Sequence, residues 1–268
     1  MSAPVLDPTV VGPRATTARP RIPMTRLVDV EFRKLVDTRS SRWLLAAVPL
    51  LTLVVVTGVT LWGSDEEVTF GMHTTTNMMP MELLLPLVAV LSVAGEWSQR
   101  SALTTFALVP RRGRVLSAKA AALLVATLAA TATVLALSAI GTVVAAQVRG
   151  IGTVWDLPLE LALRLALANV VAVAFGFLVG VAIRSTAPAM VAYLAFMFVV
   201  PILSSMVAGM WSWWAENGPW IDLSWSTAFV TAPEITGEQW AQVGTSTLIW
   251  IVVPLALATR RVLRTEIR

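Results

Sequence analysis

Long apolar stretches separated by short polar connections dominate this chain. Six stretches approach the roughly 17–25 residues that an α-helix needs to cross the hydrocarbon of a bilayer. We expect them near residues 43–62, 78–95, 115–145, 161–183, 187–209 and 243–259. The second and sixth are the shortest, and only Arg184-Ser-Thr separates the fourth from the fifth. The pattern therefore predicts six transmembrane helices, with five or seven as alternatives.

The first 41 residues are polar and divide into two parts. Residues 1–23 contain five prolines and few large apolar residues, which predicts a disordered cytoplasmic arm. Over residues 24–41, apolar side chains recur near helical spacing and charges fill the other face. This pattern predicts an amphipathic helix on the inner membrane surface, ahead of a transmembrane domain over 42–268. A solvated extension of the first span is the alternative.

Composition supports an all-α integral membrane protein. Of the 268 residues 56% are hydrophobic and 13% are charged, against about 25% charged in typical soluble domains. The mean hydropathy is +0.75. Cysteine is absent, which excludes disulfides and thiolate chemistry.

Basic residues predict the orientation. Eighteen of the twenty Lys and Arg residues fall before the first span, between the second and third, between the fourth and fifth, or after the sixth. Only Arg149 and Arg164 fall on the other side, where acidic residues gather. The positive-inside rule then places both termini of this multi-pass protein in the cytoplasm. The pI of 10.6 follows from this topology better than from nucleic-acid binding, which is the alternative reading of a basic chain.

The familiar signatures of enzyme sites are missing from the sequence. It has neither G-x-x-x-x-G-K-S/T nor G-x-G-x-x-G, so a phosphate-binding loop is not expected. G-x-S-x-G and H-E-x-x-H are missing too. The single histidine, His73, is expected in the outer loop after the first span, where it is too isolated to hold a metal. We therefore expect no metal site, no cofactor bound by this chain, and no catalytic residue of its own.

Two stripes are candidates for a transport pathway. Glu82 lies inside the second apolar stretch, about one turn from its predicted outer end, and an ionisable group there normally faces protein or a water-filled cavity. Leu85, Ala89, Ser92 and Glu96 share its helical face. On the fifth span Met190, Tyr193 and Met197 form a second stripe. The alternatives are a Glu82 that reaches the interface or caps its helix, and ordinary packing for the second stripe.

Other patterns indicate packing and anchoring. Ala172, Gly176 and Gly180 recur at four-residue spacing in the fourth span, as in close helix pairs in membranes. Residues 210–242 are rich in tryptophan, which predicts short helices at the outer interface. A substrate-contacting lid is the alternative for this region.

The basic connection between the second and third spans carries a resemblance to a known family. Glu96 is followed by Thr105-Phe-Ala-Leu-Val-Pro110-Arg111-Arg112, with Lys119 entering the third span, and Glu31-Phe-Arg-Lys34 precedes the first span. With six spans, these motifs resemble the permease subunits of type-2 ABC exporters over residues 25–268. The resemblance implies a cytoplasmic coupling helix in the connection, a second permease chain, and ATP-binding cassette ATPase subunits in trans that bind ATP and Mg.

The resemblance also implies which residues couple the spans to the ATPase. They are Glu31, Lys34, Glu96, Arg100, Thr104, Thr105, Pro110, Arg111, Arg112 and Arg114. Contact of the arginines with anionic lipid is the alternative. The resemblance implies an exporter of a bacterial plasma membrane but not its substrate. The few polar residues in the spans favour a hydrophobic or amphipathic substrate. A non-transport immunity or regulatory protein and an ion-coupled secondary transporter are the alternatives.

Overall fold

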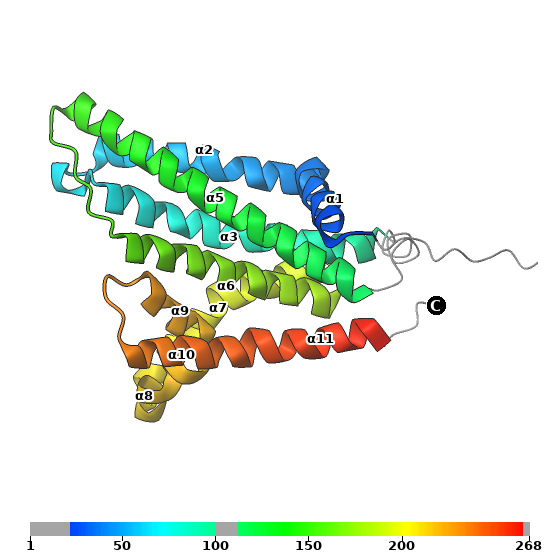
Figure 1. Ribbon diagram of the computed structural model, residues 1–268. Helices are drawn as coiled ribbons and strands as arrows, with labels where there is room; N and C mark the ends of the chain where they lie inside the picture. The colour runs from blue at the N-terminus through cyan, green and yellow to red at the C-terminus, as the bar shows by residue number, and fades with distance from the viewer. Residues whose placement is uncertain (1–21, 100–111, 265–268) are drawn as a thin grey trace, which may run out of the picture.

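Helices form nearly all of the computed structural model, which describes residues 22–99 and 112–264 (Figure 1). Six helical segments are long and apolar enough to cross a membrane. They are α2 (Arg39–Trp62), α3 (Phe70–Ser98), α5 (Arg112–Arg149), α6 (Leu159–Ile183), α7 (Thr186–Met210) and a continuous segment over Gly237–Arg264. The expected all-α architecture with six apolar spans is therefore observed in the described part of the chain.

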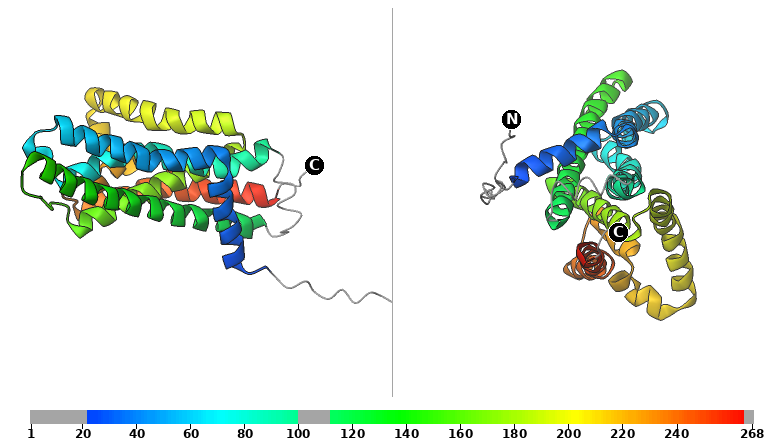
Figure 2. Two further views of the ribbon diagram at one scale, coloured as in Figure 1. Left: turned by 90° about the horizontal axis from the view of Figure 1, so that it is seen from above. Right: turned by 90° about the vertical axis from the view of Figure 1, so that its right-hand side faces the viewer.

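A shorter helix, α1 (Met24–Asp37), crosses the direction of the spans at one end of the bundle (Figure 2). We call this end the α1 end. The helix expected over 24–41 is interrupted at Thr38, whose backbone is extended, and α2 begins at Arg39. Leu27 and Leu35 are buried against the spans, while Arg33 on the other face is exposed.

The second span differs from its prediction. It begins at Phe70 instead of near residue 78, because the polar residues that precede the apolar stretch are buried inside the bundle. The Thr69 hydroxyl accepts a hydrogen bond from the Met72 amide at 3.1 Å, and the Asp156 carboxylate accepts one from the Gly71 amide at 2.6 Å. Both acceptors satisfy amides in the first turn of α3, where a carboxylate also suits the helix dipole.

The prediction that His73 lies in an outer loop is wrong. His73 is fully buried in α3, and its Nδ1 lies 2.8 Å from the Thr142 hydroxyl of α5. One turn further on, the Asn77 amide donates to the His73 carbonyl at 2.7 Å and to the Ser138 hydroxyl at 3.5 Å. These polar contacts join α3 to α5 in a region that hydropathy alone assigns to a loop.

The bundle is centred on α3 and α6. Gly176 of α6 lies directly against the backbone of Pro86, so that a Cβ at this position would approach the Pro86 carbonyl oxygen to 2.5 Å. Gly180 is less tightly packed: a Cβ there would lie 3.1 Å from Val93 Cβ and 3.2 Å from the Val90 carbonyl oxygen. The small residues predicted to form a packing stripe thus allow α6 to approach α3 closely. By contrast, few of the side chains of α2 and α7 are buried.

Two short helices, α8 (Ser212–Ile221) and α9 (Leu223–Thr231), join α7 to the sixth span. The sixth span consists of α10 (Gly237–Thr247), a π-helical turn (Leu248–Val252) and α11 (Val253–Arg264). Pro254 is the second residue after the π turn, and proline has no amide to donate to the preceding turn. The region rich in tryptophan is therefore helical, as expected.

Arg164 fastens α6 to this region at the end of the bundle opposite α1. Its side chain is almost fully buried, and its guanidinium donates to the carbonyls of Ala232 at 2.7 Å and Pro233 at 2.8 Å. It also lies 3.4 Å from Glu160 one turn earlier. Arg164 thus satisfies carbonyls at the end of α9, where the chain leaves the helix.

Candidate functional site

Two sites emerge from the packing of the helices: a cluster of charges at the α1 end and a cavity beside the middle of α3. Helix α3 takes part in both, because Glu96 belongs to the cluster and Glu82 lines the cavity. The two residues are separated by about 21 Å along the helix, at 1.5 Å per residue.

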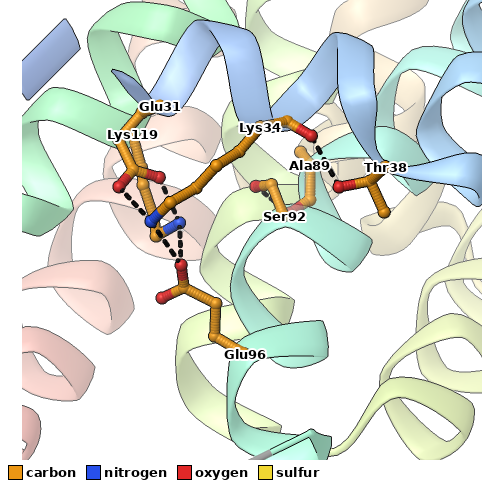
Figure 3. Close-up of polar contacts among 7 residues, drawn as sticks. All are labelled: Glu31, Lys34, Thr38, Ala89, Ser92, Glu96 and Lys119. Carbon is orange, nitrogen blue, oxygen red and sulfur yellow. Dashed lines mark hydrogen bonds and ion pairs between the residues drawn. The ribbon is translucent and has the colours of Figure 1, made fainter. Parts of the chain in front are cut away.

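The charge cluster consists of Glu31, Lys34, Glu96 and Lys119, and it joins α1, α3 and α5 (Figure 3). Lys119 Nζ donates to Glu31 Oε2 at 2.5 Å and to Glu96 Oε1 at 2.9 Å. Lys34 Nζ donates to Glu31 Oε1 at 2.7 Å and to Glu96 Oε1 at 3.0 Å. Two carboxylates and two ammonium groups therefore balance in formal charge.

Burial differs strongly among the four side chains. Lys119 and Glu31 are 5% and 7% exposed, Glu96 is 15% exposed and Lys34 is 41% exposed. Burying charged groups is costly unless each meets a counter-charge and hydrogen bonds. The geometry meets that condition, since each ammonium contacts both carboxylates.

The outermost member of the cluster, Lys34, is held in its charged form. Partial burial alone lowers the pKa of the Lys34 ammonium. The hydrogen bond from Lys34 to Glu31 and the negative charges of Glu96 and Glu31 outweigh burial and raise the pKa above its usual 10.5. Lys34 is therefore protonated throughout the physiological range.

Lys119 is the member of the cluster that sequence reasoning missed. The sequence places it at the entry of the third span but gives it no coupling role, whereas the structure buries it in α5 against both carboxylates. A signal for this position exists in the sequence: Lys119 stands between Ala118 and Ala120 inside an apolar helix, where a lysine requires an acidic partner.

Two arginines with expected coupling roles make contacts within the chain. Arg112 donates to the carbonyl of Val262 at 3.0 Å and so joins α5 to α11. Arg114 donates to the carbonyl of Ile22 at 2.5 Å, just ahead of α1. The sequence suggested a partner or lipid for these residues and did not predict either contact. The other expected coupling residues, Arg100, Thr104, Thr105, Pro110 and Arg111, lie outside the described residues.

The cavity lies between α3, α6, α7 and α9 and has a volume of about 290 Å³. Glu82 lines it, together with Tyr193 and Met197 from the second predicted stripe. The Tyr193 hydroxyl donates to the backbone carbonyl of Glu82 at 2.5 Å, which joins α7 to α3 beside the cavity. The structure thus brings members of both predicted stripes to one place.

The remaining stripe residues lie elsewhere. Leu85 and Ala89 are buried in the packed core, and Met190 packs against that core. Ser92 lines a separate pocket of about 240 Å³ around the charge cluster. A shared helical face therefore does not make a continuous pathway in this conformation.

Glu82 also lies deeper in its helix than the sequence indicated. Because α3 begins at Phe70, Glu82 is twelve residues, or about 18 Å, from the first residue of the helix. A carboxylate at that depth cannot cap the helix start, since capping acts within the first turn. The capping alternative is thereby removed.

The described residues contain no group of three or more His, Asp and Glu side chains that could hold a metal ion. Comparison of the sequence with protein-family models and with curated proteins finds no match. A functional assignment must therefore rest on the motifs, the charge cluster and the cavity.

Proposed function

We propose that this chain is the transmembrane permease subunit of an ATP-driven exporter related to the type-2 ABC family. It works as a dimer of permeases, either identical or different, with ATP-binding cassette subunits supplied by another chain. The ATPase subunits bind ATP and Mg, and the permease moves a hydrophobic or amphipathic substrate. Both termini and the α1 end face the cytoplasm of a bacterial cell.

The charge cluster is the observation that carries this proposal. It ties α1 and α5 to α3 at the end of the bundle where residues 100–111 connect α3 with α5. A displacement of α1 or of this connection by a partner is transmitted to α3 through short, charge-assisted bonds. Because α3 also lines the cavity, the same helix relays that displacement to a ligand.

The distribution of basic residues supports the orientation. Four described segments that carry basic residues lie at the α1 end of the ribbon (Figure 1): α1, the start of α5, the turn between α6 and α7, and the end of α11. Arg149 and Arg164 are the two basic residues of the opposite end in the described ranges. An inward-facing α1 end satisfies the positive-inside rule.

Co-expression with the P-loop ATPase encoded nearest to this chain tests the proposal. We expect the two proteins to co-purify and ATP hydrolysis in proteoliposomes to require an intact permease. The variant Arg111→Glu should lower co-purification, because it reverses a charge in the connection that resembles a coupling helix. Glu234→Lys, a charge reversal at an exposed residue of the opposite end, is the matched control.

Two outcomes would contradict the proposal. One is a permease that never associates with an ATPase although it folds and inserts in the membrane. The other is transport that depends on an ion gradient and not on ATP, which favours the secondary-transporter alternative.

A further inference from the structure

The cavity beside α3 contains a single charge. Glu82 is the only charged residue among those that line it. Its neighbours on α6 and α7 are Phe175, Tyr193, Phe196 and Met197, and α9 contributes Thr227. The cavity is therefore mostly apolar and aromatic, with one carboxylate at its wall and the hydroxyl side chains of Ser224, Thr227 and Thr231 on the α9 side.

No basic side chain in the described part of the chain pairs with Glu82. The ion pairs found there involve other carboxylates, and each of those has a cationic partner within 3.4 Å. A carboxylate in apolar surroundings is costly when it lacks a counter-charge. The contrast with the charge cluster on the same helix is direct, because every carboxylate there contacts two ammonium groups.

Aromatic rings surround the same space. The ring centroids of Phe175 and Phe196 lie 4.1 Å apart, and those of Phe175 and Tyr193 lie 6.3 Å apart. Aromatic faces attract organic cations, most strongly where water is excluded. Methionine adds an adaptable apolar surface next to them.

We propose that this cavity binds organic cations with an apolar body, such as aryl ammonium ions. The Glu82 carboxylate faces the charged nitrogen, and Phe175, Tyr193 and Phe196 surround the apolar body. The cavity volume of about 290 Å³ suits a compact ligand, near the lower end of the roughly 300–1,000 Å³ of small-molecule sites. That the bound cation is the exported substrate rests on the proposed function; the binding itself does not.

Equilibrium binding to the full chain in lipid nanodiscs, without any ATPase, tests this assignment. The probes are benzyltrimethylammonium and benzenesulfonate, which have similar size and opposite charge, with empty nanodiscs as the blank. We expect saturable binding of the cation and none of the anion. Glu82→Gln should weaken cation binding by about tenfold or more, since it removes the charge and keeps the shape.

A matched control variant distinguishes the effect of the Glu82 charge inside the cavity from a general effect of the protein's net charge. Glu234→Gln makes the same chemical change at an exposed residue that does not line the cavity, so cation binding should be unchanged. Phe196→Leu removes an aromatic wall and keeps the apolar character, so it should weaken binding of the cation by a few-fold. Size-exclusion profiles of all variants establish that they fold.

Cation binding that is equal in wild type, Glu82→Gln and Phe196→Leu would overturn the inference, as would equal binding of both probes. ATPase stimulation in the co-expressed complex distinguishes the two proposals. If the complex hydrolyses ATP but binds no organic cation, the proposed ligand class is wrong and the proposed exporter function stands. If the chain binds the cation but does not associate with an ATPase, the ligand class stands and the exporter function is wrong.

Discussion

Removing one member of the charge cluster leaves the other three with an unbalanced charge in a largely buried place. Lys119 is the more buried of the two basic residues in the cluster, and it bridges Glu31 of α1 to Glu96 of α3. Its substitution therefore tests the cluster more severely than that of Lys34, which is partly solvated.

We expect Lys119→Met to lower stability by about 3–5 kcal/mol, the usual cost of breaking a buried pair. The double variant Lys119→Met with Glu31→Gln should lose less, because Glu96 and Lys34 then balance each other. Thermal unfolding in detergent measures both. Asp29→Asn, which breaks the exposed pair with Arg33, is the control and should cost about 0.5 kcal/mol or less. If the stability lost in the double variant equals the sum of the losses from the two single substitutions, the charges of the cluster are not coupled.

A pH dependence is expected from Lys34. Because its pKa in the folded protein lies above 10.5, the stabilisation it provides is present below that pH and is lost as the pH rises through the folded pKa. The difference in unfolding temperature between wild type and Lys34→Met should stay constant from neutral pH to about pH 10 and shrink above it. A difference that already disappears near pH 8 would show that the carboxylates do not hold Lys34 in its charged form.

At the scale of elements, the pairing of α3 with α6 depends on backbone proximity. Gly176 faces the Pro86 carbonyl, and the backbone there cannot give way as a flexible side chain does. Gly58 of α2, in contrast, faces open space, and a Cβ added there would meet no heavy atom within 4 Å. The two glycines thus form a natural comparison.

Gly176→Ala should destabilise the bundle by about 1–3 kcal/mol, the usual cost of overpacking a core. Gly58→Ala should be neutral or slightly stabilising, because alanine favours the helix by about 1 kcal/mol over glycine. Thermal midpoints of both variants in the same detergent give the comparison. Equal midpoints would mean that α6 can move away from α3 without loss.

Sequence patterns predicted the six spans because each contains a long apolar run. They did not predict the start of α3, since hydropathy averaged over a window cannot tell buried polar residues from a loop. His73 and Asn77 satisfy part of their hydrogen-bonding capacity within the bundle, on Thr142 and Ser138 of α5. These hydrogen bonds become apparent only when the position of α5 beside α3 is known.

The candidate site was predicted in part. Periodicity placed Glu82 on one face with Leu85 and Ala89, but it does not say which helix that face meets. Along α3 the neighbours change from α7 and α9 at Glu82 to α1 and α5 at Glu96. One stripe therefore serves a cavity, a packed core and a charge cluster in turn.

At the scale of the whole molecule, the two ends of the bundle differ in charge, and this asymmetry makes a topological prediction. The sequence contains no cysteine, so single cysteines can be introduced without background. Arg33 on α1 and Glu234 between α9 and α10 are exposed at opposite ends.

We expect a membrane-impermeant maleimide to label Glu234→Cys in intact cells and Arg33→Cys only after the membrane is opened. The positive-inside rule gives this direction, because the basic end remains in the cytoplasm. Labelling after permeabilisation controls for reactivity at each site. The reverse labelling pattern in intact cells would mean that the α1 end faces outward, where the charge cluster cannot meet a cytoplasmic ATPase.

The π-helical turn in the sixth span has a consequence for how this segment tolerates length changes. Successive buried residues on its inner face are three or four positions apart in α10, as from Val243 to Ser246, but five apart from Ser246 to Ile251. The turn therefore accommodates one residue more than an α-helix would. Deleting a single residue from it would rotate everything downstream by about 100°, and Ala258 and Val262 would leave their buried positions. The inner faces of the two halves of this span follow different helical phases, and the extra residue keeps both facing inward.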